Sequence, residues 1–404
     1  MIITKKKLTF FSDNHLHLLS ILNNFGSESR FIGGCVRDAL LNKQSADIDI
    51  ATTLLPTQII QALTEHKINF ITIGIDFGTI TAFIEKEQIE ITTLRKDLSS
   101  NGRHPKVTYT KNFEEDAYRR DFTINALSYC PFKQEIYDYC NGMEDLAKAN
   151  VVFIGDPVIR ICEDYLRILR FFRFTGRFSK HFNPQGLKAC IDLRQNLTQL
   201  SKERIKWEIS KIIALDNFEF ILEKMFADGI LQIILPVSYF DTKPFETVHS
   251  FKRENNIQIS SFTKYALIFY ATETLSIEKL CSLKFSNKEA AAIFDIIEFA
   301  KNFDNADISF LLKKAWLEKP EYLDYIAVCI GIGKLDISTA IKFISEHQAS
   351  ARPKFQINGS DLINQGIQGV AIGKALTFLK NEWIKSDFTL SKSELLNMSQ
   401  DENK

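Results

Sequence analysis

The chain has 404 residues, with 50 lysines and arginines balanced by 50 aspartates and glutamates, so its formal net charge is zero. This length allows two to four domains, and the neutral total excludes a global basic field, so any nucleic-acid partner must bind a local patch. The seven cysteines form no C-x-x-C pair and no run approaches 18 apolar residues, which predicts a protein of the reducing cytoplasm that does not cross a membrane.

A glycine pair, Gly33-Gly34, joins a short predicted strand to a helical pattern over residues 35–41. Glycines at a strand-to-helix turn let backbone N–H groups approach a phosphate, although a lone glycine pair is more often an ordinary turn. The interpretation as a phosphate-binding turn therefore depends on the residues that come next in the chain.

Two aspartates come after this turn in the alternating run Asp47-Ile48-Asp49-Ile50. Alternation with period two is typical of a strand, whose residues i and i+2 point to the same face. The isoleucines can then enter a core while Asp47 and Asp49 share one exposed edge. Neighbouring carboxylates repel each other unless a cation neutralises them, and hard oxygen ligands suit Mg²⁺. The pair predicts a metal site beside a phosphate-binding turn, although such pairs on exposed strands are often only structural.

Residues 30–140 have the pattern of a mixed α/β domain. A helix is predicted over 56–66, and strands are predicted over 69–75, 78–84, 88–94 and 106–110. Residues 95–105 are polar and contain a glycine, which predicts a mobile loop that could act as a lid.

The segment 114–126 places many charges in a short space, including Arg119, Arg120 and Asp121. Because arginine offers a forked set of donors, the two arginines could clamp a triphosphate or fix a ribose. A solvated helix with internal ion pairs is the alternative interpretation of the same residues.

Helical periodicity dominates from about residue 150 almost to the end of the chain, and β-rich alternation nearly vanishes there. Residues 151–211 carry 12 lysines and arginines against 6 aspartates and glutamates. This local excess could serve nucleotide phosphates or an RNA backbone, or it could be a solvated helical surface.

One helix, predicted over 160–178, has an apolar stripe on the side away from Arg167 and Arg170, with Asp164 beside Arg167. An amphipathic helix with surface ion pairs would explain this pattern. A sharper interpretation rests on hydrogen bonds, because Asp accepts from an exocyclic amino group and Arg donates to a ring nitrogen. Asp164 and Arg167 would then accept cytosine and adenine, and would leave unpaired polar groups against uracil and guanine.

Five motifs follow one another over about residues 28–211: RFIGGCVRDALL…ADIDIAT, RRDFTINAL, DYCNGMEDLAKANVVFIGDP, EDYLRILRFFRF and LSKERIKWEISKII. In combination they resemble the motifs of the class II (bacterial-type) tRNA nucleotidyltransferases, the CCA-adding enzymes, with their relatives the bacterial poly(A) polymerases. The resemblance implies an α+β fold, with a polymerase-β-like nucleotidyltransferase head (a mixed sheet with helices) followed by an all-α neck, body and tail.

The same resemblance implies a division of labour along the chain. We expect the catalytic head over 1–150, a neck that reads the nucleobase over 151–211, a body over 212–280 and a tail that binds tRNA over 281–404. The implied activity is addition of C, C and A to tRNA 3′ ends from CTP and ATP, with Mg²⁺ and release of pyrophosphate but no nucleic-acid template. No particular oligomeric state is implied.

Carried over position by position, the resemblance also gives the motif residues their roles. Asp47 and Asp49 would bind Mg²⁺ and act in catalysis, while Glu90 would be either a third catalytic carboxylate or a surface residue of its strand. The nucleotide would contact residues at its triphosphate (Gly33, Gly34 and Arg37), at its ribose and phosphates (Arg120, Asp121 and Asn125) and at its base (Asp164 and Arg167, supported by Arg170 and Arg173).

Several related activities compete with full CCA addition: addition of CC only, addition of A only, polymerisation of A, or an RNA-binding module without catalysis. Relatives that add only CC characteristically lack the loop between the first two motifs, and residues 95–105 keep it. A poly(A) polymerase would carry a more basic C-terminal extension, and loss of an aspartate would favour a module without catalysis. The sequence therefore favours full CCA addition.

Overall fold

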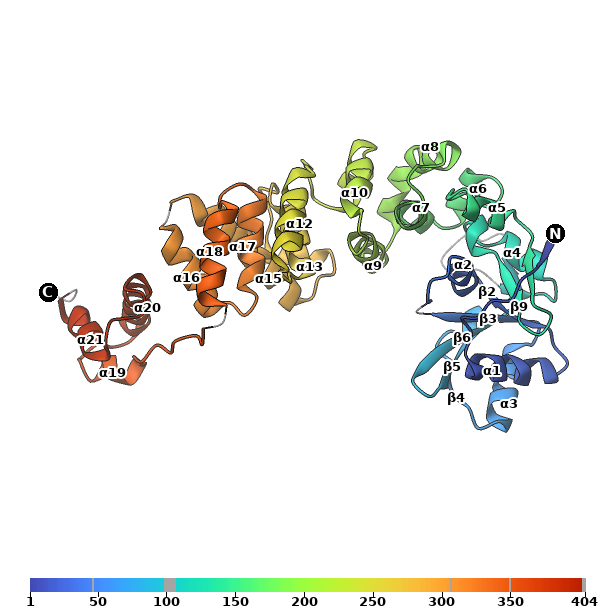
Figure 1. Ribbon diagram of the computed structural model, residues 1–404, viewed down its shortest axis with the longest axis horizontal. Helices are drawn as coiled ribbons and strands as arrows, with labels where there is room; N and C mark the ends of the chain where they lie inside the picture. The colour runs from blue at the N-terminus through green and yellow to red at the C-terminus, as the bar shows by residue number, and fades with distance from the viewer. Residues whose placement is uncertain (46, 98–106, 306, 349, 402–404) are drawn as a thin grey trace. The chain divides into compact units, whose positions relative to one another are not determined.

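The structure is a computed structural model that describes residues 1–45, 47–97, 107–305, 307–348 and 350–401 (Figure 1). The chain divides into two compact units, unit 1 over Met1–Ile234 and unit 2 over Leu235–Lys404. None of the helices in the described ranges combines the length and the apolar character that a membrane span requires.

Among the described residues of unit 1, eight strands form a mixed sheet in the order β1-β10-β9-β2-β3-β6-β5-β4. They are β1 (Ile2–Lys5), β2 (Ser29–Ile32), β3 (Ile48–Thr52), β4 (Asn69–Ile71), β5 (Thr79–Ile84), β6 (Glu87–Thr93), β9 (Ser128–Cys130) and β10 (Glu135–Asp138). β3 and β6 run parallel, with Asp49 opposite Glu90, and the other neighbouring strands run antiparallel. A separate antiparallel pair joins β7 (Arg95–Asp97) to β8 (Val107–Tyr109).

The helices of unit 1 begin between the strands and continue after the last strand (Figure 1). They are α1 (Asp13–Asn24), α2 (Gly34–Leu40), α3 (Pro56–Glu65), α4 (Phe113–Tyr118), α5 (Gly142–Ala147), α6 (Pro157–Glu163), α7 (Leu166–Phe178), α8 (Pro184–Leu193), α9 (Lys202–Ile213), α10 (Phe218–Ala227) and α11 (Leu231–Ile234), with 3₁₀ turns η1 (Ile75–Phe77), η2 (Thr123–Asn125) and η3 (Arg194–Gln199).

Successive side chains of β3 lie in two different environments. Ile50, with Ile48 against it, belongs to a core that includes buried residues of α1 and α3. Ala51 belongs to a smaller cluster with Phe113 of α4. Because successive residues of a strand point to opposite faces, Asp49 shares the face of Ala51. The alternation predicted for this segment is therefore confirmed.

An aromatic cluster fixes α7 against the segment that follows α4. The ring of Phe171 lies 5.4 Å from that of Phe153 and 6.3 Å from that of Phe122, and Phe122 and Phe153 are 4.8 Å apart. Each such pair adds about 0.5–1.5 kcal/mol beyond the burial of its area. The apolar side of α7 is thereby buried, which leaves its arginines on the other side.

The prediction of one continuous helix over 160–178 is wrong, because α6 ends at Glu163 and α7 begins only at Leu166. Asp164 has an extended backbone, with φ −157° and ψ 105°, and its Oδ1 accepts the N–H of Leu166 at 3.1 Å. A short acidic side chain that bonds the local backbone competes with helical hydrogen bonding. Asp164 is thus a cap at a helix break rather than a member of a helical face.

The other predicted elements of unit 1 have mixed outcomes. The helix over 56–66 and the strands near 78–84, 88–94 and 106–110 are confirmed within a few residues, and the strand over 69–75 is confirmed only to Ile71. The prediction of a loop over 95–105 is wrong for residues 95–97, which form β7, and residues 98–105 lie outside the described residues.

The regular elements among the described residues of unit 2 are all helical, which confirms the predicted helical character of this part of the chain. Its helices are α12 (Lys243–Asn255), α13 (Ser261–Phe269), α14 (Ile277–Ser282), α15 (Asn287–Lys301), α16 (Ile308–Glu318), α17 (Tyr322–Gly331), α18 (Ile337–His347), α19 (Gly359–Ile363), α20 (Val370–Lys385) and α21 (Lys392–Asp401), with a 3₁₀ turn η4 (Asn302–Asn305). Buried Asp324 of α17 accepts hydrogen bonds from Ser260 and Thr263 and so ties α17 to α13. The domain boundaries near 150, 211 and 280 stay predictions.

Candidate active site

A cavity of about 1040 Å³ in unit 1 brings together nearly all of the predicted site residues. It is lined by the turn before α2, the start of β3, the segment after α4, and helices α7 and α9. The predicted residues on its wall are Gly33, Gly34, Arg37, Asp47, Asp49, Arg120, Asp121, Asn125, Asp164, Arg167, Arg170 and Arg173. Glu90 is the one predicted residue that does not line it.

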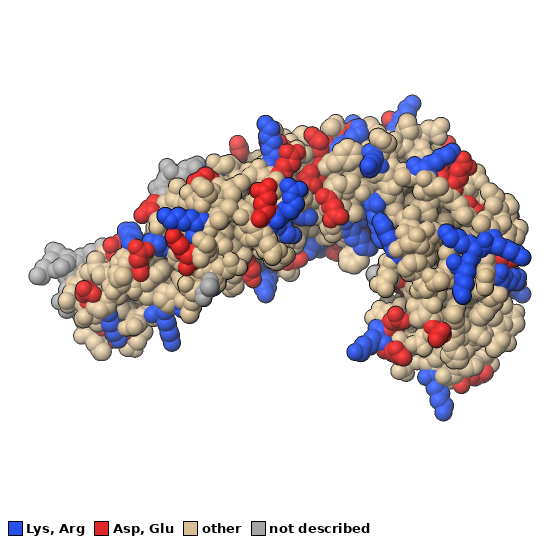
Figure 2. Space-filling view, viewed as in Figure 1, with Lys and Arg blue, Asp and Glu red and all other residues tan. Residues whose placement is uncertain are grey.

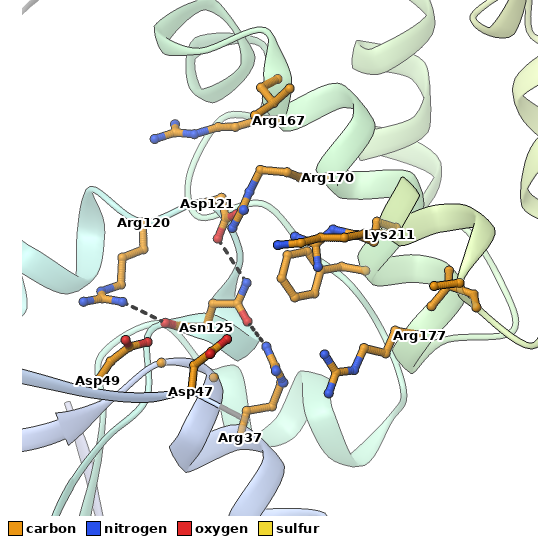
Figure 3. A pocket seen from close by; sticks show the side chains of 18 of the residues that line it. Arg37, Asp47, Asp49, Arg120, Asp121, Asn125, Arg167, Arg170, Arg177 and Lys211 are labelled. Carbon is orange, nitrogen blue, oxygen red and sulfur yellow. Dashed lines mark hydrogen bonds and ion pairs between the residues drawn. The ribbon is translucent and has the colours of Figure 1, made fainter. Parts of the chain in front are cut away.

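Asp47 and Asp49 place two carboxylates next to each other at the cavity (Figure 3). Asp47 is exposed and Asp49 is half-buried. No hydrogen bond or ion pair to another described residue reaches either carboxylate. Burial, together with the charges of Glu90 and Asp47, raises the pKa of Asp49 to about 6. The two side chains therefore carry charge that no partner neutralises by direct contact.

Two carboxylates without a partner fit a divalent cation, because Mg²⁺ is usually held by one or two carboxylates plus the phosphates of a substrate. The described residues contain no group of three or more acidic, histidine or cysteine side chains that could hold a metal ion. Glu90 lies opposite Asp49 in the register of β3 and β6, but its side chain is exposed. The donor set at the cavity thus consists of two carboxylates, with Glu90 as their neighbour in the sheet.

Gly33 keeps open the space between Asp49 and Arg120. Its φ of +76° lies in the region that favours glycine. A Cβ at this position would lie 3.3 Å from Arg120 Nη1 and 3.9 Å from Asp49 Oδ2. Any other residue would strain the turn and would project into the space where a phosphate could meet the arginine.

A chain of hydrogen bonds crosses from α2 to α7 along the cavity (Figure 3). Arg37 Nη1 donates to Asn125 Oδ1, and Asn125 Nδ2 donates to Asp121 Oδ1 at 3.1 Å. Asp121 Oδ2 in turn accepts from Arg170 Nε at 2.7 Å. Although burial acts to raise it, Arg170 and Asn125 hold the pKa of Asp121 below its usual value. Both arginines are therefore fixed in place by the protein itself.

Buried carboxylates hold the neighbouring arginines in the same way. Glu208 of α9 accepts from Arg173 Nε at 2.6 Å. Asp38 is shared by Arg37, at 2.8 Å, and by Arg177, at 3.0 Å. Because removing a guanidinium from water is costly without a partner, these acids make an arginine-rich wall possible.

Arg119 and Arg120 form the predicted internal ion pairs and also line the cavity, while their binding of a triphosphate or ribose stays a prediction. Each pairs with buried Asp116, at 2.7 Å and 3.1 Å respectively, so the internal ion pairs are present. Each also lines the cavity, and Arg120 Nη1 lies 3.5 Å from the carbonyl oxygen of Asn125. The ion pairs orient the two guanidinium groups at the wall of the cavity.

Asp164 and Arg167 both line the cavity, and each has a partner of its own. Asp164 Oδ2 accepts from Arg204 Nη2 at 2.7 Å. Arg167 pairs with Glu163 and donates to the carbonyl oxygen of Arg119 at 3.2 Å. The two half-buried side chains thus present an acceptor and a donor on one wall without binding each other.

Sequence reasoning missed part of the wall. The missed residues are Lys43, Leu166, Phe174, Gly176, Arg177, Arg204, Lys211 and the segment 214–217. Three of them belong to the basic excess over 151–211, but that excess does not show which members face the cavity. Helical spacing carries a usable signal for α9, because Arg204, Glu208 and Lys211 share one face of that helix.

Basic side chains outnumber acidic ones on the cavity wall by ten to five. On the face of the molecule seen in Figure 2, by contrast, the two signs are interspersed. The neutral total therefore hides a locally positive cavity, which suits a polyphosphate ligand.

Two family sequence models match the chain, the first within unit 1 and the second over the end of unit 1 and the first residues of unit 2. The model described as the poly A polymerase head domain matches residues 29–152. The model described as the probable RNA and SrmB-binding site of polymerase A matches residues 181–239.

Individual proteins match over nearly the whole chain. Human mitochondrial CCA tRNA nucleotidyltransferase 1 is 32% identical over 404 residues, which cover 96% of this chain and 90% of that protein. The structure of the Bacillus stearothermophilus CCA-adding enzyme in complex with CTP aligns with a TM-score of 0.74 and 22% identity over 96% of each chain. The Thermotoga maritima CCA-adding enzyme complexed with tRNA(CCA) aligns with a TM-score of 0.69 and 19% identity over 100% of each chain. The structural likeness confirms the expected fold.

Proposed function

The chain belongs to the family of CCA tRNA nucleotidyltransferases and poly(A) polymerases, and we infer from this membership that it is a CCA tRNA nucleotidyltransferase. It adds C, C and A in turn to the 3′ end of tRNA, from CTP and ATP and without a nucleic-acid template. In each addition the 3′-hydroxyl oxygen bonds to the α-phosphorus, and the bond from that phosphorus to the leaving pyrophosphate breaks.

One observation carries this function. A single cavity joins two carboxylates without partners to a positively charged wall and to an acceptor–donor pair, Asp164 and Arg167, that could read a base. Metal-binding carboxylates alone would suit many phosphoryl transfers. The addition of a base-reading pair favours a reaction whose substrate is a nucleotide.

Members of the polymerase-β-like nucleotidyltransferase family typically use a divalent metal, and Asp47 and Asp49 would hold it. The ion, which we propose to be Mg²⁺, would when bound neutralise charge on the triphosphate and favour an ionised 3′-hydroxyl. Arg37 and Arg120 would bind the phosphates, and the open turn at Gly33 would let them approach. Because these arginines are already oriented by Asn125 and by buried acids, little rearrangement is needed when the nucleotide binds.

The choice of base would rest on Asp164 and Arg167. Cytosine and adenine both offer an amino donor beside a ring-nitrogen acceptor, which matches a carboxylate beside a guanidinium. Uracil and guanine would instead place a carbonyl acceptor against the carboxylate and an N–H donor against the guanidinium, a mismatch that costs about 1–3 kcal/mol for each group. Arg204 can keep its contact with Asp164 meanwhile, because a carboxylate accepts several hydrogen bonds.

The decisive experiment offers the purified protein a tRNA that lacks its CCA end, with CTP alone, with ATP alone or with both, and sequences the products. We expect CC from CTP alone and CCA from both nucleotides. Products that end only in CC, that gain only A or that carry an A tail would identify one of the related activities instead. The expectation of a cytoplasmic location stays a prediction, since the human relative is named as mitochondrial.

A further inference from the structure

Trp207 of α9 is an exposed aromatic side chain close to the cavity. Its exposed fraction is 64%, whereas the other two tryptophans of the chain, Trp316 and Trp383, are 4% and 5% exposed. A tryptophan leaves a large flat apolar surface in water when it is exposed. Its surroundings on α9 indicate what could cover that surface.

The helix places Trp207 between two basic residues of the cavity wall. Arg204 and Lys211 lie three positions before it and four positions after it, so the three side chains share one side of α9. Lys211 Nζ lies 4.5 Å from the centroid of the Trp207 ring, and both basic residues line the cavity. Trp207 is not on the wall itself. Its ring therefore lies at the rim of the cavity, beside positive charge.

We propose that Trp207 is a stacking site for a base in the single-stranded 3′ end of the tRNA that receives the new nucleotide. This inference rests on the proposed function and adds a subsite for the acceptor RNA to it. Exposed aromatic rings flanked by basic side chains bind single-stranded nucleic acid by stacking on bases while the cations contact phosphates. The residue also lies within the segment 181–239, which matches a model described as a probable RNA-binding site.

The chemistry of the reaction favours stacking over base-specific contacts at this place. The terminal base of the acceptor changes with each addition, while the same cavity must receive the end every time. Every base has a π-face, so a stacking contact tolerates the change, whereas hydrogen bonds to base edges would not. Asp164 and Arg167 would select the incoming nucleotide, and Trp207 would hold the acceptor without selection.

The first test uses Trp207 as its own reporter, because it is the one strongly exposed tryptophan of the three. Acrylamide quenching of tryptophan fluorescence is measured on the full chain with and without a saturating tRNA transcript that lacks CCA. We expect the transcript to lower the quenching constant about twofold or more, and Trp207→Phe to remove both the quenchable emission and the effect. Unchanged quenching at saturation would overturn the proposal.

The second test separates RNA binding from nucleotide binding by kinetics. Trp207→Ala is expected to raise the KM for tRNA about tenfold, in line with the loss of one stacked base, while CTP binding without tRNA stays unchanged. Trp207→Phe keeps an aromatic face and is expected to change this KM less than about threefold. Phe132→Ala removes another exposed aromatic side chain of unit 1, 56% exposed and outside the cavity, and is the matched control with no expected effect.

The outcomes distinguish a failure of the stacking site from a failure of the proposed function. If wild-type protein extends tRNA but Trp207→Ala keeps the wild-type KM, the stacking site is wrong and the proposed function stands. If wild-type protein does not extend tRNA with CTP and ATP, the proposed function itself is wrong. Should Trp207→Ala fail to fold, the quenching experiment on wild-type protein still decides the stacking site.

Discussion

Asp47 and Asp49 carry carboxylates that no described side chain neutralises by contact, whereas Asp121 and Asp164, on the same cavity wall, each hold an arginine. The paired acids orient basic groups that would otherwise repel one another. The acids without partners leave their oxygen atoms available to a ligand. Acidic residues of one cavity therefore have different roles. Whether a carboxylate has a basic partner indicates its role better than its position in the cavity does.

The two kinds of acidic residue should differ in what they contribute to the stability of the fold. A paired, buried carboxylate strengthens the fold, and its loss strands the charge of its partner. A carboxylate without a partner, next to others of the same sign, weakens the fold slightly until a cation binds. Substitutions in the two groups should therefore separate activity from stability.

The largest effect is expected from Asp47→Ala and Asp49→Ala. Either change removes one of the two proposed metal-binding carboxylates and should lower the rate of CMP addition by about 10³-fold or more. The temperature of unfolding should stay the same or rise, because no ion pair is broken. Incorporation of labelled CTP into tRNA that lacks CCA measures the first quantity, and calorimetry measures the second.

Chelation provides the control for this pair of variants. Treatment of wild-type protein with EDTA should reproduce the loss of activity, and excess Mg²⁺ should restore it in wild-type protein only. Product formation at the wild-type rate by either variant would refute the metal assignment.

Asp121→Asn, by contrast, should cause a large loss of stability. Asp121 is buried and bonded to Arg170, and the loss of such a bond to a charged group costs about 2–3 kcal/mol. The pKa of Asp121 lies below its usual value, so its contribution is fully present at neutral pH. That contribution fades as the pH falls below about 4, where the carboxyl of the unfolded chain, and then of the folded chain, is protonated.

The measurement is urea unfolding of both proteins at several pH values. The difference between wild type and Asp121→Asn should be greatest at neutral pH and should shrink in acid. A difference that stays constant down to pH 3, or that grows in acid, would contradict the assigned pairing.

The local sequence pattern was enough to predict the strand near Asp47 and Asp49 and the glycine turn beside it. The strand at Ile48–Thr52 follows from period-two alternation, and the turn at Gly33 follows from a conformation that favours glycine. These features depend on neighbours within a few residues. The placement of Asp47 and Asp49 on one face of the strand, beside the glycine turn, could therefore be predicted from the sequence, whereas the cavity that they line could not.

The contacts between the acidic residues and the arginines of the cavity wall join distant segments of the chain. The sequence was less informative about these contacts. Asp121 meets Arg170 across 49 residues because an aromatic cluster holds α7 in place. The helix break at Asp164 was not predicted, because apolar periodicity continues across it. A local hydrogen bond from the backbone to the Asp164 side chain decides the outcome. The partner of Asp164, Arg204, lies 40 residues away and carries no signal in the motif itself.

Asp164→Ala tests what a paired acid contributes when it also faces the ligand. Removal of the acceptor should increase incorporation of UTP and GTP relative to CTP and ATP by about 10²-fold, because the carboxylate no longer faces the carbonyl acceptor of uracil or guanine. Competition assays with mixed nucleotides measure this ratio. Arg204→Gln, which removes the partner but keeps the acceptor, is the matched control and should keep the selectivity within a few-fold. Unchanged selectivity of Asp164→Ala, at a normal rate, would show that the base is read elsewhere.

Glu90→Gln is expected to have the smallest effect of these substitutions. Glu90 resembles the proposed metal-binding aspartates in one respect and a surface residue in another. It stands opposite Asp49 in the sheet and contributes to the raised pKa of that residue, yet its side chain is exposed and outside the cavity. Since glutamine keeps the shape but removes the charge, we expect a loss of about tenfold in CMP addition through weaker attraction for the metal. A loss as large as that of Asp49→Ala would make Glu90 a full metal ligand. A rate equal to that of wild type would place it with the surface residues of its strand.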